Sequence, residues 1–262
     1  MVEWAMKIMV CGKGGSGKTV ISILMAKALS ERFKAYIVDS DESNSLLPIF
    51  LDVNPPRPLV EYVGGKKEEE DFERMKPDIL KALSTAKGGI KLSSLPSEYI
   101  ATSREGVGLV IIGKVREYGE GCACPFSILM KILLGNLSLE RGEVVVIDTD
   151  AGVEHVGRSV EEVSDGVLAV VDPTAESLEL ALMLKKVADA LGKKYWAIVN
   201  KVTDDIRDLI VKGASKIGLN IDGLVRFDRE LYISCLKKEP LKAGVALLDV
   251  KRIVEEKIIP EF

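Results

Sequence analysis

A short stretch near the amino terminus has the residue types and spacing of a loop that binds phosphate. GKGGSGKT, residues 12–19, fits the pattern G-x-x-x-x-G-K-[ST] and stands between an apolar run and a helical pattern. Glycines in such a loop let backbone N–H groups turn toward phosphate oxygens, and the helix that begins near Lys18 directs its positive dipole end at them. Lys18 then reaches the β- and γ-phosphates, and the Thr19 hydroxyl coordinates Mg²⁺. The predicted nucleotide-binding residues of this loop are Gly12, Lys13, Gly14, Gly15, Ser16, Gly17, Lys18 and Thr19.

Acidic residues follow two further apolar runs. Asp39 and Asp41 lie in IVDSDESN, and Asp148 ends the run VVVID. Ligands of open α/β sheets bind at the carboxyl ends of the strands, where carboxylates can orient an attacking water or reach Mg²⁺ through water. The alternative is that a carboxylate at a strand end only caps a helix. We interpret Asp39 and Asp148 as carboxylates that bind Mg²⁺, directly or through water.

A pair of cysteines, Cys122 and Cys124, forms the pattern C-x-C in GEGCACPFSIL. Thiolates are soft ligands that suit Zn²⁺, Ni²⁺, Cu⁺ or an iron–sulfur cluster, but two of them leave a four-coordinate site half empty. Cys11, Cys235 and His155 offer no obvious third ligand. A symmetric dimer would place the same loop of each chain opposite its mate and complete the site. The alternative is two small, buried or disulfide-linked cysteines.

The elements that must position these residues alternate between strands and helices. Most of the strand runs are continuously apolar, which is typical of strands buried on both faces of a parallel sheet. The strands are expected at Lys7–Cys11, Ala35–Asp39, Leu109–Gly113, Val144–Asp148, Val167–Val171, Tyr195–Asn200 and Ile221–Phe227. Helices are expected at Lys18–Phe33, Ala175–Leu191 and Asp204–Ile217, and Cys235 lies in a late helix. The alternation predicts an α/β protein with a doubly wound, mostly parallel sheet flanked by helices.

One region interrupts this alternation. Residues 51–85 contain three closely spaced prolines and then the charge run KKEEEDFERMK, which is typical of a surface helix. We interpret the region as a helical insertion, around residues 51–105, in a single P-loop domain that spans residues 1–262. The length is greater than that of a usual domain, but α/β domains of this size are common.

The composition limits the classes of partner. A net charge of -4 and a pI near 5.4 make the surroundings of the protein weakly repulsive to nucleic acid and to anionic membranes. No apolar stretch approaches the roughly 20 residues that span a bilayer, and no signal peptide is visible. We therefore expect a cytoplasmic protein without a membrane or nucleic-acid partner.

Lys13 is a second lysine in the phosphate loop, although one lysine suffices to neutralise the β- and γ-phosphate oxygens. A cation that points away from its own nucleotide could serve that of another subunit, and the alternative is a merely exposed lysine. The residues GKGGSGKT resemble the deviant Walker A loop of the MinD/ParA ATPase superfamily. In that superfamily the first lysine crosses a face-to-face dimer interface. The resemblance implies that Lys13 contacts the phosphates of a partner and that ATP holds a homodimer together.

The same resemblance assigns further roles. It implies that Lys13, Lys18 and Asp41 are catalytic and that Asp41 supports hydrolysis from the first switch, where Glu42 stands in place of a frequent proline. It also implies that Asn200, in AIVNK, binds adenine, because an amide can both donate to and accept from the base edge. The alternative for Asn200 is a turn asparagine.

Three motifs point to a particular branch of the superfamily. GCACP, IDTDAGVEHVGR and VVDPTAESLELA closely resemble the CooC family, the nickel-insertion ATPases that mature carbon monoxide dehydrogenase. In that family the C-x-C pair binds metal at the ATP-dependent dimer interface, which implies a Ni²⁺ or Zn²⁺ ion shared by Cys122 and Cys124 of two chains. Carbon monoxide dehydrogenase is then the implied client. Val20 replaces the second threonine usual in GKTT, so we expect slow hydrolysis of ATP to ADP.

Rival functions require other features. A MinD-type membrane ATPase would have a basic amphipathic tail, whereas DVKRIVEEKIIPEF mixes acids and bases. A ParA-type DNA partner would require a basic face, and a nitrogenase-like reductase would require two well-separated cysteines per chain. The alternative left open is an ATP-dependent dimer switch or scaffold with another partner. Its C-x-C pair would be structural or would bind zinc or an iron–sulfur cluster.

Overall fold

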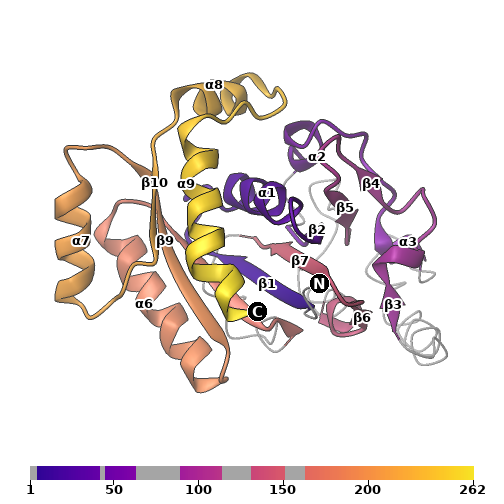
Figure 1. The fold of residues 1–262 in the computed structure, drawn as a ribbon, viewed down its shortest axis with the longest axis horizontal. Coiled ribbons are helices and arrows are strands. Elements are labelled where there is room, and N and C mark those ends of the chain that lie inside the picture. Colours follow the sequence, from indigo (N-terminus) through magenta and orange to yellow (C-terminus); the bar gives the residue numbers. More distant parts are fainter. Residues whose placement is uncertain (1–4, 42–44, 63–88, 114–130, 151–162) are drawn as a thin grey trace, which may run out of the picture.

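The fold is described from a computed structural model, which covers residues 5–41, 45–62, 89–113, 131–150 and 163–262. The strands are β1 (Met6–Cys11), β2 (Lys34–Asp39), β3 (Ile90–Lys91), β4 (Ala101–Thr102), β5 (Gly108–Ile111), β6 (Leu137–Ser138), β7 (Glu143–Asp148), β8 (Gly166–Val171), β9 (Lys194–Val202) and β10 (Gly223–Arg226). The main sheet has the order β10-β9-β8-β1-β7-β2-β5-β4 (Figure 1). Its neighbouring strands are parallel except β4 and β5, which are antiparallel. The predicted α/β class with a mostly parallel sheet is confirmed.

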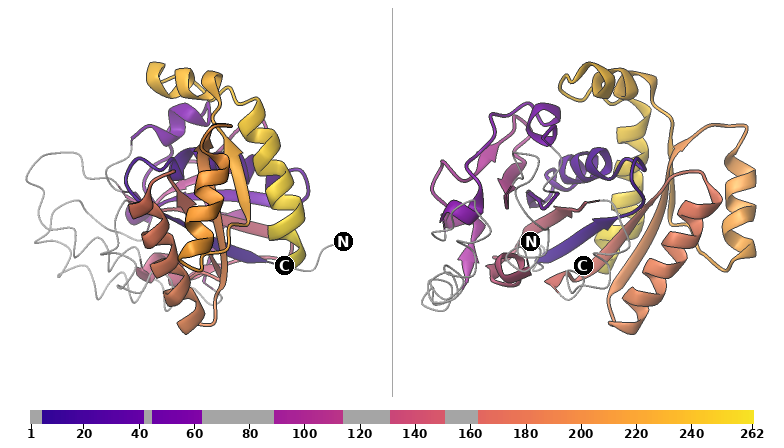
Figure 2. Two further views of the ribbon diagram at one scale, coloured as in Figure 1. Left: turned by 90° about the vertical axis from the view of Figure 1, so that its left-hand side faces the viewer. Right: turned by 180° about the vertical axis from the view of Figure 1, so that it is seen from behind.

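The helices cover both faces of this sheet. They are α1 (Lys18–Leu29), α2 (Leu47–Phe50), α3 (Leu59–Tyr62), α6 (Ala175–Ala190), α7 (Arg207–Lys216), α8 (Arg229–Lys237) and α9 (Val245–Ile253). Short turns of 3-10 helix lie at Leu92–Ser94 and Ile259–Glu261, a turn of π-helix lies at Val254–Ile258, and residues 131–135 are also helical. α1 and α9 pack on one face, and α6 and α7 pack on the other (Figure 2).

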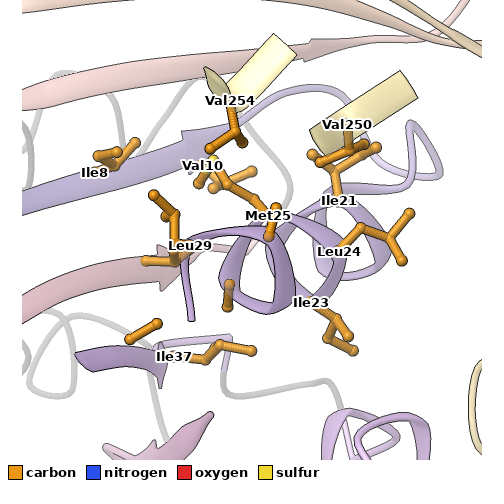
Figure 3. Close-up of a cluster of buried hydrophobic side chains, with 14 of the residues drawn as sticks. Ile8, Val10, Ile21, Ile23, Leu24, Met25, Leu29, Ile37, Val250 and Val254 are labelled. Carbon is orange, nitrogen blue, oxygen red and sulfur yellow. The ribbon is translucent and has the colours of Figure 1, made fainter. Parts of the chain in front are cut away.

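Alternate side chains of β1 divide between the two cores. Ile8 and Val10 belong to the core under α1 and α9, whereas Met9 and Cys11 belong to the core under α6. This follows from the two-residue period of a strand, whose successive side chains point to opposite faces. Figure 3 shows Val10 beside Met25 of α1 and near Val254 of the carboxyl-terminal helical segment, with Ile8 farther along β1. Both faces of β1 are therefore buried, which explains its continuously apolar sequence.

The predicted elements are present, and their ends differ by a few residues. The first helix ends at Leu29 instead of Phe33, because residues 30–32 continue as a turn in which the amide of Phe33 donates to the Leu29 carbonyl at 2.9 Å. The helix expected from Asp204 begins at Arg207 after a turn. The last strand is shorter than expected and spans Gly223–Arg226.

The region predicted as a helical insertion contains strands that the sequence reading missed. β4 extends the main sheet by antiparallel pairing with β5, and β3 pairs with β6 in a separate two-stranded sheet. Each of these strands has two residues, which is too short for a periodic pattern to reveal. The charge run predicted to form a surface helix lies outside the described residues.

One carboxylate joins the helices that follow β10. Asp228 Oδ1 accepts from the amides of Glu230 and Leu231, at 3.1 Å each, and caps α8. Its Oδ2 accepts from the amides of Gly244, at 2.7 Å, and Ala246, at 3.2 Å, at the start of α9. Desolvation opposes ionisation of this buried side chain, but the four amides outweigh it and lower the pKa of Asp228. Asp228 therefore ties the start of α9 to the start of α8.

Candidate nucleotide site

The phosphate loop joins β1 to α1 and needs glycine at two of its positions. A Cβ atom on Gly12, whose φ is +152°, would lie 2.3 Å from the Val170 carbonyl oxygen. A Cβ atom on Gly17, whose φ is +95°, would lie 2.4 Å from Nδ2 of Asn200. Both distances are too short for any other residue type. Gly17 is also the N-cap of α1 and provides no capping side chain, so the amides of the first turn face the loop.

Lys18 lies over this loop. Its side chain is buried, and its Nζ atom donates to the Lys13 carbonyl across the loop at 3.4 Å. Burial of an ammonium group is costly unless a partner of opposite charge or several acceptors compensate. The position of Lys18 at the amino end of α1 therefore suits a bound anion, as the sequence predicts.

Two carboxylates end neighbouring strands beside the loop. Asp39 of β2 and Asp148 of β7 are partners in the parallel register, and both are fully buried. Ser40 fixes the end of β7, because its amide (2.9 Å) and hydroxyl (2.6 Å) both donate to the Asp148 carbonyl. Asp41 follows at a half-buried position, and its amide donates to Oδ1 of Asp39 at 3.2 Å. The three acids lie together at the carboxyl edge of the sheet, as expected for parallel strands.

The environment of Asp148 suits a cation. Burial raises the pKa of this carboxyl to about 6. Hydrogen bonds from the side chains of Thr19 and Ser22 favour the ionised form and partly oppose this increase. The negative charge of Asp41 raises this pKa further, and Lys18 lowers it. Ser22 Oγ donates to Oδ1 of Asp148 at 2.9 Å. The sequence analysis missed Ser22, although it stands three residues after Thr19 and hence on the same face of α1.

The residues present fit a magnesium ion. The Oδ2 atom of Asp148 is buried and receives no hydrogen bond from any residue that the structure describes. No group of three or more His, Cys, Asp or Glu in the described ranges forms a ready metal cage. Mg²⁺ in nucleotide sites binds through one or two protein oxygens, substrate phosphates and water. Thr19 and Asp148 are the residues that would hold the ion, with Asp39 beside them.

Lys13 and Asn200 contact their own chain. The Lys13 ammonium pairs with the carboxylate of Glu176, in the first turn of α6. Asn200 is buried, and its Nδ2 donates to the Ser16 carbonyl at 2.9 Å while its Oδ1 accepts from the amide of Lys201 at 2.9 Å. The structure thus brings Asn200 to the phosphate loop, and its contact with adenine stays a prediction.

Sequence reasoning missed Lys201. Its Nζ atom donates to the Gly15 carbonyl, at 2.6 Å, and to Oδ1 of Asp172, at 2.8 Å. The dipeptide Asn-Lys after an apolar strand was the only signal in the sequence for this contact. Asp172 directly follows β8, so Lys201 of β9 links the phosphate loop to the end of β8 as well.

The predicted thiolate site cannot be placed. Cys122, Cys124 and His155 lie outside the described residues, and so does Glu42 of the first switch. Cys11 is buried in β1, and Cys235 is half-buried in α8. The shared metal site stays a prediction.

A strand, a glycine-rich loop, a helix and a buried carboxylate at the end of the neighbouring strand define a P-loop nucleotide-binding protein. Residues 7–241 match the family model described as CobQ/CobB/MinD/ParA nucleotide binding domain. The chain belongs to this family. No helix within the described part of the chain is long and apolar enough to cross a membrane.

The proteins that are similar to this chain are consistent with this family assignment. An uncharacterized ATP-binding protein of Methanocaldococcus jannaschii, MJ0084, is 39% identical over 95% of this chain and 98% of its own length. The carbon monoxide dehydrogenase accessory protein CooC of Rhodospirillum rubrum is 29% identical over 77% of this chain and 76% of its own length. The septum site-determining protein MinD of Pyrococcus horikoshii, solved with Mg-ADP, superposes with a TM-score of 0.66 at 17% identity and covers 98% of each chain. Because the identity to MinD is low, this similarity shows a shared fold and nothing more.

Proposed function

We propose that this protein is a cytoplasmic, ATP-dependent dimerising metallochaperone, built as a single P-loop ATPase domain. It binds and slowly hydrolyses Mg·ATP and delivers nickel to carbon monoxide dehydrogenase. The observation that carries the ATPase part is Asp148, a buried carboxylate with an unused oxygen beside Thr19 and Lys18. The nickel part is supported by the C-x-C pair and by the likeness to CooC of Rhodospirillum rubrum.

The described side chains suggest how the phosphates are handled. Lys18 and the amides at the start of α1 hold the β- and γ-phosphate oxygens. Thr19 and Asp148 would hold the magnesium ion, which would help to neutralise the charge on these oxygens. Asp41 orients the attacking water. The hydrogen bond from its backbone N–H to the Asp39 carboxylate holds the backbone of Asp41 beside Asp148. Lys13 leaves Glu176 and contacts the phosphates bound to a second chain.

Nickel is the cargo of the proposed dimer. Four thiolates, from Cys122 and Cys124 of each chain, would enclose one ion, because a closed four-sulfur site satisfies Ni²⁺ or Zn²⁺ and a single C-x-C does not. ATP closes the dimer, so ATP and metal each change the affinity for the other by the same factor. Hydrolysis then opens the site and releases the ion to the client.

Titration of Ni²⁺ into the full chain tests the cargo site. We expect one ion per two chains in the presence of the non-hydrolysable ATP analogue AMPPNP. The affinity for Ni²⁺ should decrease as the pH is lowered, because the thiols become protonated. The Cys122→Ala, Cys124→Ala double variant should lose this binding, whereas Cys235→Ala, in a helix, should keep it. One ion per chain, or unchanged affinity in the double variant, contradicts the shared site.

A dimer switch or scaffold with another partner is the second candidate. It is supported by the ATP-binding relative MJ0084, which is more similar to this chain (39% identical) than CooC is (29% identical). In this case ATP would still drive dimerisation, but neither Ni²⁺ nor Zn²⁺ would change it. Sedimentation with ATP, with and without each metal, separates the two functions.

A further inference from the structure

Two consecutive residues of β9 hold two consecutive carbonyls of the phosphate loop. Asn200 Nδ2 donates to the Ser16 carbonyl at 2.9 Å, and Lys201 Nζ donates to the Gly15 carbonyl at 2.6 Å. In a regular strand, neighbouring side chains point to opposite faces of the sheet. These two side chains reach the same loop, so the strand must depart from regular geometry here.

The departure is a β-bulge. Leu224 of β10 pairs with Val199 of β9, and Arg226 pairs with Val202. Asn200 and Lys201 thus stand opposite a single residue of β10. Bulges redirect side chains and are common next to active sites, although they are rare between parallel strands.

Lys201 also has an unfavourable backbone conformation. Its φ of +59° lies in the left-handed region, which a residue with a Cβ atom adopts at a cost. Such strain persists only where the surrounding contacts compensate. The contacts of Lys201 are its ion pair with Asp172, at 2.8 Å, and its hydrogen bond to the loop carbonyl.

Holding these carbonyls orients the amides of the loop. The C=O and N–H of a trans peptide point in opposite directions. When the Ser16 carbonyl turns toward Asn200, the Gly17 amide turns to the opposite side, away from β9. Likewise the amide of Ser16, opposite the carbonyl held by Lys201, donates within the loop to the Lys13 carbonyl at 3.2 Å. Inward-facing amides are the groups that bind phosphate.

We propose that Asn200 and Lys201 form a carbonyl clamp, and that Lys201 is a positioning residue that holds the phosphate loop ready for the nucleotide. Asp172 keeps the Lys201 ammonium on the loop and neutralises it, so Lys201 acts on phosphate through the loop backbone and not by direct contact. The inference rests on the nucleotide-binding part of the proposed function and is independent of metal delivery.

Variants of Lys201 in the full chain separate this role from a structural one. Lys201→Gly removes the ammonium and also relieves the backbone strain, so we expect equal or higher thermal stability with an affinity for Mg·ADP lowered about 10- to 100-fold. Lys201→Arg should restore most of the affinity. The matched control is Lys194→Met, at the other end of β9, which should bind Mg·ADP as the wild type does.

Asp172→Asn distinguishes the clamp from a direct phosphate contact. If Asp172 keeps Lys201 on the loop, its loss should weaken Mg·ADP binding. If Lys201 instead contacts phosphate, removal of the nearby negative charge should strengthen binding, and that result would overturn the proposal. Mg·ADP affinity of Lys201→Gly within twofold of the wild type would overturn it as well. A failure of nickel binding would leave these measurements unaffected.

Discussion

Lys13 and Glu176 form an ion pair within one chain, between the phosphate loop and the first turn of α6. Both side chains are well exposed to solvent, and exposed ion pairs contribute only about 0–1 kcal/mol. A contact this weak can be exchanged for the phosphates of a second chain. The pair therefore provides a partner within the same chain for the predicted trans lysine before dimerisation.

Variants of this pair should change dimerisation in opposite directions. Lys13→Ala should bind Mg·ATP as a monomer and fail to form the ATP-dependent dimer. Glu176→Gln frees the lysine of each chain, so we expect a dimer up to about 30-fold tighter, the factor that corresponds to about 1 kcal/mol for each of the two chains. Sedimentation with AMPPNP measures both effects. If the wild type stays a monomer with nucleotide and metal present, the trans role of Lys13 is wrong.

Binding and turnover should separate at two other residues of the site. Lys18→Ala removes the buried ammonium group from the phosphate loop, and we expect it to abolish measurable Mg·ATP binding. Asp41→Ala should bind Mg·ATP but lose about 100-fold or more in turnover, the usual contribution of a group that orients or activates water. Calorimetry and phosphate release measure the two quantities. Wild-type ATP binding by Lys18→Ala would contradict the nucleotide site.

Asp148 should make the ligand-free protein less stable above pH 6. Because the folded state raises its pKa from 3.8 to about 6, the folded protein holds this proton more tightly than the unfolded chain. This contribution to stability is full below pH 3.8 and is lost as pH rises through about 6. The loss is on the order of 3 kcal/mol for a shift of this size.

Asp148→Asn does not titrate and isolates this effect. Without nucleotide, we expect the variant to resist urea better than the wild type at pH 7.5, by an advantage that shrinks at pH 5. The same variant should lose most of the stabilisation by Mg·ADP, since Mg²⁺ requires the ionised oxygen. An advantage of equal size at both pH values would show that Asp148 does not cause the pH dependence.

Asp228 should be among the most sensitive positions for stability outside the nucleotide site. Its carboxylate caps α8 and α9, and each lost cap costs about 1 kcal/mol, so Asp228→Ala should lower the free energy of unfolding by about 2 kcal/mol. Since its pKa is lowered, this stabilisation is present above its ordinary pKa and is lost as pH falls below it. Urea unfolding at pH 7 measures the cost. Asp208→Ala, in the exposed first turn of α7, is the matched control and should change stability by less than half as much.

The local sequence determined the chemistry of the phosphate loop and the type of most elements. The pattern of residues 12–19 lies within one strand–loop–helix unit, so its glycines, Lys18 and Thr19 come together through short-range geometry alone. Asp39 and Asp148 were predictable for a related reason. Parallel strands end at one edge of the sheet, and each acid directly follows an apolar run.

The tertiary structure decided which groups hold that loop. Lys13 meets Glu176 across 163 residues, and Lys201 meets Gly15 across 186. No period or motif encodes such contacts, because they depend on strand order and on the register between β9 and β10. The bulge turns two neighbouring side chains toward one loop, whereas the alternation of a strand predicts opposite faces. The short strands β3 and β4 escaped prediction because two residues carry no period, and only pairing with a partner strand makes them regular structure.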